Sequence, residues 1–85
     1  MSIYVDALVP CLPNAHWRYN ESCHMFATTE QELDDFADGL GLRKDWKQGD
    51  GNRVHYDLTR NKRQMAIKHG AIEITRKQVV ELLHR

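Results

Sequence analysis

Apolar residues recur with a helical period in one segment of the chain, directly after a polar start signal. Four of them fall at positions i, i+3, i+4 and i+7, on one face of a helix: Leu33, Phe36, Ala37 and Leu40. The preceding Thr29-Glu30-Gln31-Glu32 has the Thr-x-x-Glu pattern of a capping box, in which Thr29 and Glu32 satisfy backbone amides at the helix start. Gly39 is typical of a helix C-terminus. These signals predict a helix over residues 30–39.

The same signals predict two more helices near the C-terminus. Thr59 precedes one segment and Gly70 follows it, which indicates a helix over residues 60–69. Thr75 and Gln78 form a second capping box, which indicates a helix over residues 76–84.

Short runs rich in β-branched and aromatic residues predict four strands, at residues 2–6, 23–27, 54–58 and 71–74. In the third of these, alternation places His55 and Asp57 on the face opposite to Val54, Tyr56 and Leu58. The order β-β-α-β-α-β-α with short joints predicts an α/β fold, with a small, largely parallel sheet of three or four strands packed with three helices. The alternative is an α+β fold with an antiparallel strand pair. Residues 1–85 are expected to form a single domain.

Composition and charge narrow the function classes. The chain has 85 residues, with 12 Lys and Arg against 12 Asp and Glu, and this balance argues against a general polyanion binder or a disordered polyelectrolyte. The balance hides an asymmetry, because residues 1–40 carry seven acids and one base, whereas residues 41–85 carry eleven bases and five acids. The two parts therefore have net charges of −6 and +6.

Basic residues stand at two predicted helix starts, where the helix dipole favours acids. They are Arg60, Lys62 and Arg63 in the second helix and Arg76 and Lys77 in the third. A bound anion at these helix starts would explain them, since helix N-termini bind phosphate groups. The alternative is that they pair with acidic residues of the same chain.

Four residues are candidates for catalysis because they stand in or at the ends of predicted strands: Asp6, His24, His55 and Asp57. Ligands of open parallel sheets gather at the carboxyl ends of the strands, where Asp6, Thr28 with Thr29, and Asp57 are expected. Imidazoles and carboxylates serve as acid–base groups or as ligands of Zn, Mn or Ni. No familiar zinc-binding spacing is present, so the sequence assigns no metal ligand by motif and identifies no cofactor. The alternative is a purely structural role for these residues.

Two tryptophans, Trp17 and Trp46, lie in irregular segments beside basic residues. Aromatic rings among basic residues are typical of sites that stack nucleobases. The same rings can also close the rim of a small core, and the sequence leaves both interpretations open.

The chain contains no run of ten apolar residues, so neither a membrane span nor a signal-peptide core is predicted. Two cysteines without any sign of secretion favour reduced thiols. We therefore expect a cytoplasmic protein in a bacterial or host cytosol, with no membrane partner.

Several short segments occur in an order that resembles a family of small bacterial and phage domains of unknown function with a His-Tyr-Asp signature. They are Tyr-Val-Asp at 4–6, His24 with Ala27, the EL..FA..LGL pattern at 32–42, His-Tyr-Asp-Leu-Thr at 55–59 and Gly-Ala at 70–71. The resemblance spans residues 4 to about 74. Some such domains resemble modules found alongside predicted HD-type phosphohydrolases, which implies a link to nucleotide metabolism. Family members often have Ser, Asp and His where this chain has Cys23, Thr28 and Asp34.

Three functional hypotheses follow. The first is a phage or bacterial domain that binds a phosphate-bearing ligand, a nucleotide or nucleic acid, at the carboxyl edge of its sheet. The second is a small metal-dependent hydrolase or nuclease built on the catalytic candidates. The third is a non-enzymatic interaction module, such as a phage accessory protein that binds a host factor or a homodimer held by the two charged parts. The sequence alone does not decide whether the protein is an enzyme.

Overall fold

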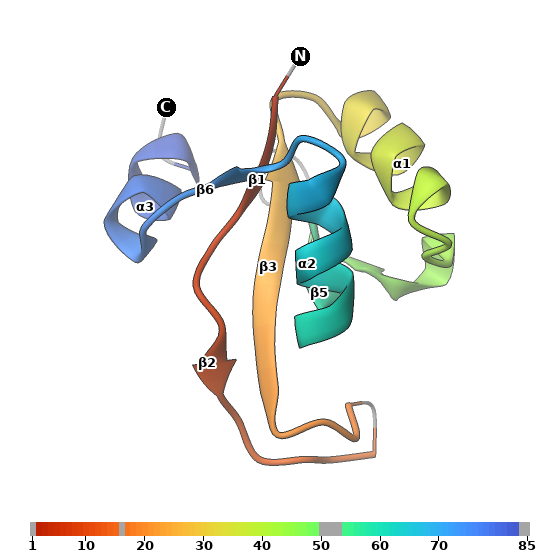
Figure 1. The fold of residues 1–85 in the computed structure, drawn as a ribbon, viewed down its shortest axis with the longest axis vertical. Coiled ribbons are helices and arrows are strands. Elements are labelled where there is room, and N and C mark those ends of the chain that lie inside the picture. Colours follow the sequence, from red (N-terminus) through yellow and green to blue (C-terminus); the bar gives the residue numbers. More distant parts are fainter. Residues whose placement is uncertain (1, 16, 50–53, 84–85) are drawn as a thin grey trace.

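The computed structural model describes residues 2–15, 17–49 and 54–83 (Figure 1). Its strands are β1 (Ile3–Val5), β2 (Val9–Pro10), β3 (Glu21–Ala27), β4 (Lys47–Gln48), β5 (His55–Leu58) and β6 (Ile72–Glu73). Its helices are α1 (Glu30–Gly39), the 3-10 helix η1 (Lys44–Trp46), α2 (Arg60–Lys68) and α3 (Arg76–Leu83). The three predicted helices and four predicted strands are confirmed, with end points shifted by a few residues. The structure adds β2, η1 and β4.

The sheet is mixed and mostly antiparallel, so the prediction of a largely parallel sheet is wrong. Its strand order is β4-β5-β3-β1-β6, and β2 pairs separately with β3. Among the strands that the structure describes, β1 and β6 form the one parallel pair, whereas the β1–β3, β2–β3, β3–β5 and β4–β5 pairs are antiparallel. The fold is therefore α+β, as in the alternative interpretation.

The sheet is mostly antiparallel because the chain adds a short strand, β4, between α1 and β5. The sequence pattern presents this segment as a loop. After β3, helix α1 returns the chain, so that β4 runs in the same direction as β3. The chain then reverses, and β5 enters the sheet between β3 and β4, antiparallel to both. A single additional reversal thus changes the direction of β5.

Helices α1 and α2 cover one face of the sheet (Figure 1). Leu33 and Ala37 of α1 and Ala66 of α2 pack in one core with the alternate strand residues Met25 and Tyr56. Both helices begin as predicted, because the threonine before each accepts a hydrogen bond from the third helical amide, at 3.2 Å in both cases.

Helix α3 lies apart from the other two, next to β6 (Figure 1). Tyr4 and Phe26, which point away from the main core, pack there with Ile74 and Val79. The rest of this outer face carries His24, His55 and Asp57. No helix in the part of the chain that the structure describes is long and apolar enough to cross a membrane.

Candidate functional site

The site begins with the pairing of β3 and β5, which sets His24 directly opposite Asp57. Opposite residues of an antiparallel pair project from the same face of the sheet. The His24 Nε2 and Asp57 Oδ1 atoms are 3.7 Å apart. Because Tyr56 points into the core, its neighbours His55 and Asp57 share the outer face, as alternation predicted.

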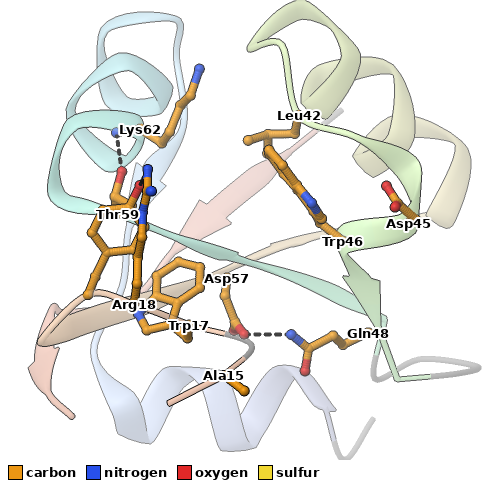
Figure 2. A pocket seen from close by; sticks show the side chains of 11 residues that line it. Ala15, Trp17, Arg18, Leu42, Asp45, Trp46, Gln48, Asp57, Thr59 and Lys62 are labelled. Atoms are coloured by element: carbon orange, nitrogen blue, oxygen red, sulfur yellow. Dashed lines mark hydrogen bonds between the residues drawn. The ribbon is translucent and has the colours of Figure 1, made fainter. Parts of the chain in front are cut away.

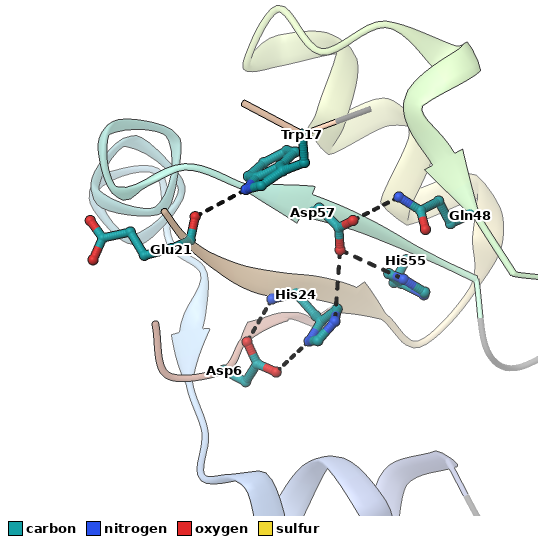
Figure 3. Close-up of polar contacts among 7 residues, drawn as sticks. All are labelled: Asp6, Trp17, Glu21, His24, Gln48, His55 and Asp57. Carbon is teal, nitrogen blue, oxygen red and sulfur yellow. Dashed lines mark hydrogen bonds and ion pairs between the residues drawn. The ribbon is translucent and has the colours of Figure 1, made fainter. Parts of the chain in front are cut away.

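His55 completes a cluster of three side chains on this face (Figure 3). Its Nε2 atom lies 3.8 Å from the same Asp57 oxygen, and its ring centroid lies 5.1 Å from that of His24. One potential ligand atom from each of His24, His55 and Asp57 lies within 4.8 Å of the other two. We call these three residues the HHD cluster.

Asp6 holds His24 in one orientation. The Asp6 side chain is buried at the end of β1, and its two oxygens accept from the backbone amide of His24 at 2.6 Å and from the ring Nδ1 at 2.8 Å. Since an ionised carboxylate can only accept, the proton is assigned to Nδ1, and Nε2 carries the lone pair of the neutral ring. The ring nitrogen suited to a metal ion therefore faces His55 and Asp57.

Gln48 of β4 holds the Asp57 carboxylate in one orientation. Its Nε2 donates to Asp57 Oδ2 at 2.7 Å, while Oδ1 of the same carboxylate faces both imidazoles (Figure 3). Outer hydrogen bonds of this kind, from a carboxylate to a ligating histidine and from a donor to a ligating carboxylate, orient the ligands of metal sites. Both His24 and Asp57 have such a hydrogen bond.

The distances between the ligand atoms of the HHD cluster suit a first-row divalent metal ion. Two ligand atoms of a tetrahedral zinc ion lie about 3.3 Å apart, because the Zn–N and Zn–O bonds are about 2.0 Å long. The separations of 3.7 and 3.8 Å between Asp57 and the two histidines exceed this by less than a bond length. The His24 side chain is 41% exposed, so an ion can enter from solvent and keep a coordination position for water or substrate.

All four catalytic candidates of the sequence therefore come together, but the expected convergence of strand ends is only partly correct. Asp6 and Asp57 both contact His24, because β1 and β5 run in the same direction on either side of β3. Thr28 and Thr29 follow β3, which runs the other way, and Thr28 donates its amide to Ser2 at the start of β1. The threonines thus stand at the opposite end.

The basic residues of the two helix starts do not form one group, because α2 and α3 pack on opposite faces of the sheet. Arg60 pairs with Glu21 through two hydrogen bonds of 2.8 and 2.9 Å, and this guanidinium lowers the pKa of Glu21. Arg63 donates to the Asp6 carbonyl and to Glu73, at 2.9 and 3.1 Å.

The remaining basic candidates differ in surroundings. Lys62 donates to the Leu40 carbonyl at 2.7 Å and lines a pocket beside the HHD cluster. Lys77 is exposed on α3, and the Arg76 side chain lies outside the described part of the chain.

A pocket of about 770 Å³ opens next to the HHD cluster, and both predicted aromatic candidates line it (Figure 2). Trp46 projects from η1 and is 48% exposed. Trp17 comes from the segment between β2 and β3, and its indole Nε1 donates to the Glu21 carbonyl at 3.1 Å. Asp57 and Gln48 line the same pocket, so the cluster and the pocket are contiguous.

Gln48 is the site residue that sequence reasoning missed. It lies in β4, where the residues lack the alternation of a long strand. One signal was present, since Lys47-Gln48 precedes Gly49-Asp50-Gly51, a composition typical of a turn between strands. Gly49 indeed has a positive φ of 81°.

The departures from the resembled family do not touch the HHD cluster. Cys23 is fully buried on the inner face, where burial raises the pKa of its thiol to about 12, so it is no nucleophile at neutral pH. Asp34 lies in α1 and accepts from the Tyr56 hydroxyl at 3.1 Å, also on the inner side of the sheet.

A comparison with protein families matches residues 3–85 to a family described as a protein of unknown function, DUF4031. The match covers the HHD cluster, Asp6 and both tryptophans. Comparisons with curated proteins and with solved structures found no match.

Proposed function

The chain belongs to the DUF4031 family, and we propose that it is a small metal-dependent hydrolase of phosphate-bearing substrates. One observation carries the proposal: His24, His55 and Asp57 present three ligand atoms within 4.8 Å of one another. The hydrogen bonds from His24 to Asp6 and from Gln48 to Asp57 support it, because they hold two of the ligands in the required orientation.

The ligand set favours a borderline transition metal. Two imidazoles and one carboxylate suit Zn²⁺, Mn²⁺ or Ni²⁺ better than Mg²⁺ or Ca²⁺, which prefer oxygen ligands. Three protein ligands are also the number typical of hydrolytic zinc sites, where the fourth position holds water.

The chemistry that this arrangement supports is hydrolysis of a phosphate ester. A Zn²⁺ ion held by His24, His55 and Asp57 would lower the pKa of a bound water to about 7 and would polarise a phosphoryl oxygen. The reaction would consume one water for each ester bond: the water would lose one proton, its oxygen would form a bond to phosphorus, the ester P–O bond would break, and the departing oxygen would take up a proton.

Anion binding is the second part of the proposal. Lys62 and Thr59, the N-cap residue of α2, line the adjoining pocket, and together with a metal ion on the HHD cluster they would favour negative charge there. Arg60 and Arg63 are engaged with Glu21 and Glu73, so they contribute to the field around the site more than to direct contact with a ligand.

Calorimetric titration of the chelator-treated protein with Zn²⁺, Mn²⁺ and Ni²⁺ tests the metal site. We expect one ion per chain, and a loss of affinity of at least tenfold in His55→Ala and Asp57→Asn. His69→Ala and Asp38→Asn are matched controls, because both residues are exposed and lie outside the cluster. Thermal melting of each variant separates a lost ligand from a lost fold.

Hydrolysis is tested with p-nitrophenyl phosphate and bis(p-nitrophenyl) phosphate. We expect metal-dependent release of p-nitrophenol from at least one of them, absent in folded His55→Ala. Failure to bind any of the three ions would overturn the whole proposal. Metal binding without turnover on either ester would overturn hydrolysis and leave a metal-dependent binding protein.

A further inference from the structure

The pocket beside the HHD cluster has the size and lining of a site for one small aromatic ligand. Its volume of about 770 Å³ falls within the range of about 300–1,000 Å³ that is usual for small-molecule sites. Trp17 and Trp46 supply aromatic surface on its walls (Figure 2). Tyr19 also lines the pocket. Planar bases stack on such rings.

Both tryptophans contact neighbouring side chains. The backbone amide of Trp17 donates to Asn14 Oδ1 at 2.9 Å, and its ring meets that of Tyr19 edge to face at a centroid distance of 5.2 Å. The Trp46 ring has the Arg43 guanidinium 6.0 Å from its centroid. At Trp17 a ligand therefore meets an aromatic surface that is already restrained, which lowers the entropy cost of binding.

Asp57 connects the pocket to the HHD cluster through its two oxygens. Oδ1 faces His24 and His55, whereas Oδ2 accepts from Gln48, which also lines the pocket. The metal position therefore adjoins Oδ1 of Asp57, whereas Oδ2 of the same carboxylate is on the side of Gln48. A ligand for both parts needs a planar base for the pocket and a phosphate group for the metal position, which a nucleoside phosphate combines in one molecule.

The charges that line the pocket cancel. Arg18 and Lys62 are basic, and Asp45 and Asp57 are acidic, so the lining alone does not attract a phosphate dianion. A divalent ion on the HHD cluster adds two positive charges at one end. Phosphate binding is therefore expected to depend on the metal ion.

We infer that this pocket binds a free nucleoside 5′-phosphate, with its base against Trp17 and Trp46 and its phosphate on a metal ion held by the HHD cluster, and that the metal ion binds first. The inference rests on the metal site of the proposed function and specifies its substrate class. The volume has room for one nucleotide, which favours a free nucleotide over a nucleic-acid strand.

Intrinsic fluorescence tests it directly, because Trp17 and Trp46 are the only two tryptophans in the sequence and both line the pocket. The protein is loaded with the ion found by calorimetry and titrated with AMP, with excitation at the red edge of the tryptophan band. We expect saturable quenching in the wild type and in each of Trp17→Phe and Trp46→Phe. Chelator-treated protein should show no saturable change.

Three comparisons separate the parts of the ligand. Ribose 5-phosphate lacks the base and adenosine lacks the phosphate, so both should bind at least fivefold more weakly than AMP in competition with it. Trp46→Ala should raise the Kd for AMP at least fivefold, about the smallest effect of losing one base stack. Val80→Ala is the control, since Val80 is exposed on α3 and does not line the pocket.

The outcomes are distinct. If the metal ion binds but AMP and ribose 5-phosphate bind equally, the base pocket is wrong and the metal site stands. If AMP binds equally well with chelator present, the order of binding is wrong. If an oligonucleotide binds and AMP does not, the inference that the ligand is a free nucleotide is wrong. If no metal ion binds in calorimetry without nucleotide, the proposed function fails and this inference fails with it.

Discussion

Nε2 of His24 lies 3.7 Å from Oδ1 of Asp57, on neighbouring strands that run in opposite directions. This proximity follows from a strand register that pairs the two residues directly. Its consequence is a short line of polar groups across the outer face of the sheet, from Asp6 through His24 and Asp57 to Gln48 (Figure 3). Each group in the line restricts the orientation of the next.

Replacing Asp6 with asparagine should weaken both the fold and the metal site. Asp6 accepts two hydrogen bonds from His24, one at each oxygen, and an amide has only one accepting atom. One donor of His24 then loses its partner, or the ring changes tautomer and places its proton on Nε2. We expect Asp6→Asn to lose about 1.5–3 kcal/mol of unfolding free energy, as for a hydrogen bond to a charged group.

Urea denaturation measures the loss of stability, and calorimetry measures the metal affinity, which should decrease about 10- to 100-fold. Asp38→Asn, on the exposed side of α1, is the control and should change neither quantity. An Asp6→Asn variant with the wild-type metal affinity would contradict the assigned role of Asp6.

Replacing Gln48 with alanine should affect the metal site without affecting the fold. Gln48 is exposed, and its side chain donates to Asp57 Oδ2 at 2.7 Å. Without this donor the carboxylate can rotate, so the metal affinity should decrease about tenfold. The unfolding free energy should stay within about 0.5 kcal/mol of the wild type, as for most surface substitutions.

The matched control for Gln48 is Gln31→Ala. Gln31 also donates from its side-chain amide to an exposed carboxylate, that of Asp35 at 3.0 Å, but it lies on α1. Equal effects of the two substitutions on metal affinity would argue against a specific role for Gln48.

The stability of the protein should depend on pH through Cys23 in the alkaline range. Burial raises the pKa of this thiol from 9.0 to about 12 in the folded state. The contribution of the neutral thiol is therefore complete below about pH 9 and is lost progressively as the pH rises toward 12. We expect the unfolding free energy of the wild type to decrease more steeply over this range than that of Cys23→Ala.

Thiol labelling provides an independent check of the same burial. At pH 8 a disulfide reagent should modify only the partly exposed Cys11 in the folded protein, and both cysteines after denaturation. Folded Cys11→Ser should not react. Parallel stability curves for the wild type and Cys23→Ala, or rapid labelling of folded Cys11→Ser, would show that Cys23 is accessible to solvent.

The sequence by itself determined the helices, the main strands and the faces of those strands. Thr29 and Thr59 cap α1 and α2 as their sequence positions predict, because a cap depends on contacts within one helical turn. His55 and Asp57 share a face opposite to Tyr56, because side chains alternate along a strand. These signals are local, so they can be recognised without knowledge of the fold.

Only the tertiary structure decided which strands pair and in which direction. The two-residue strand β4 pairs antiparallel with β5, which is itself antiparallel to β3, and brings Gln48 to the site, yet β4 is too short to have a hydrophobic period of its own. The pairing of His24 with Asp57, and the burial of Asp6 beside them, depend on segments far apart in the sequence. Strand register is set by the combined packing of the whole sheet and its helices, and for that reason His24, His55 and Asp57 could be proposed from the sequence, while their arrangement and the contact with Gln48 could not.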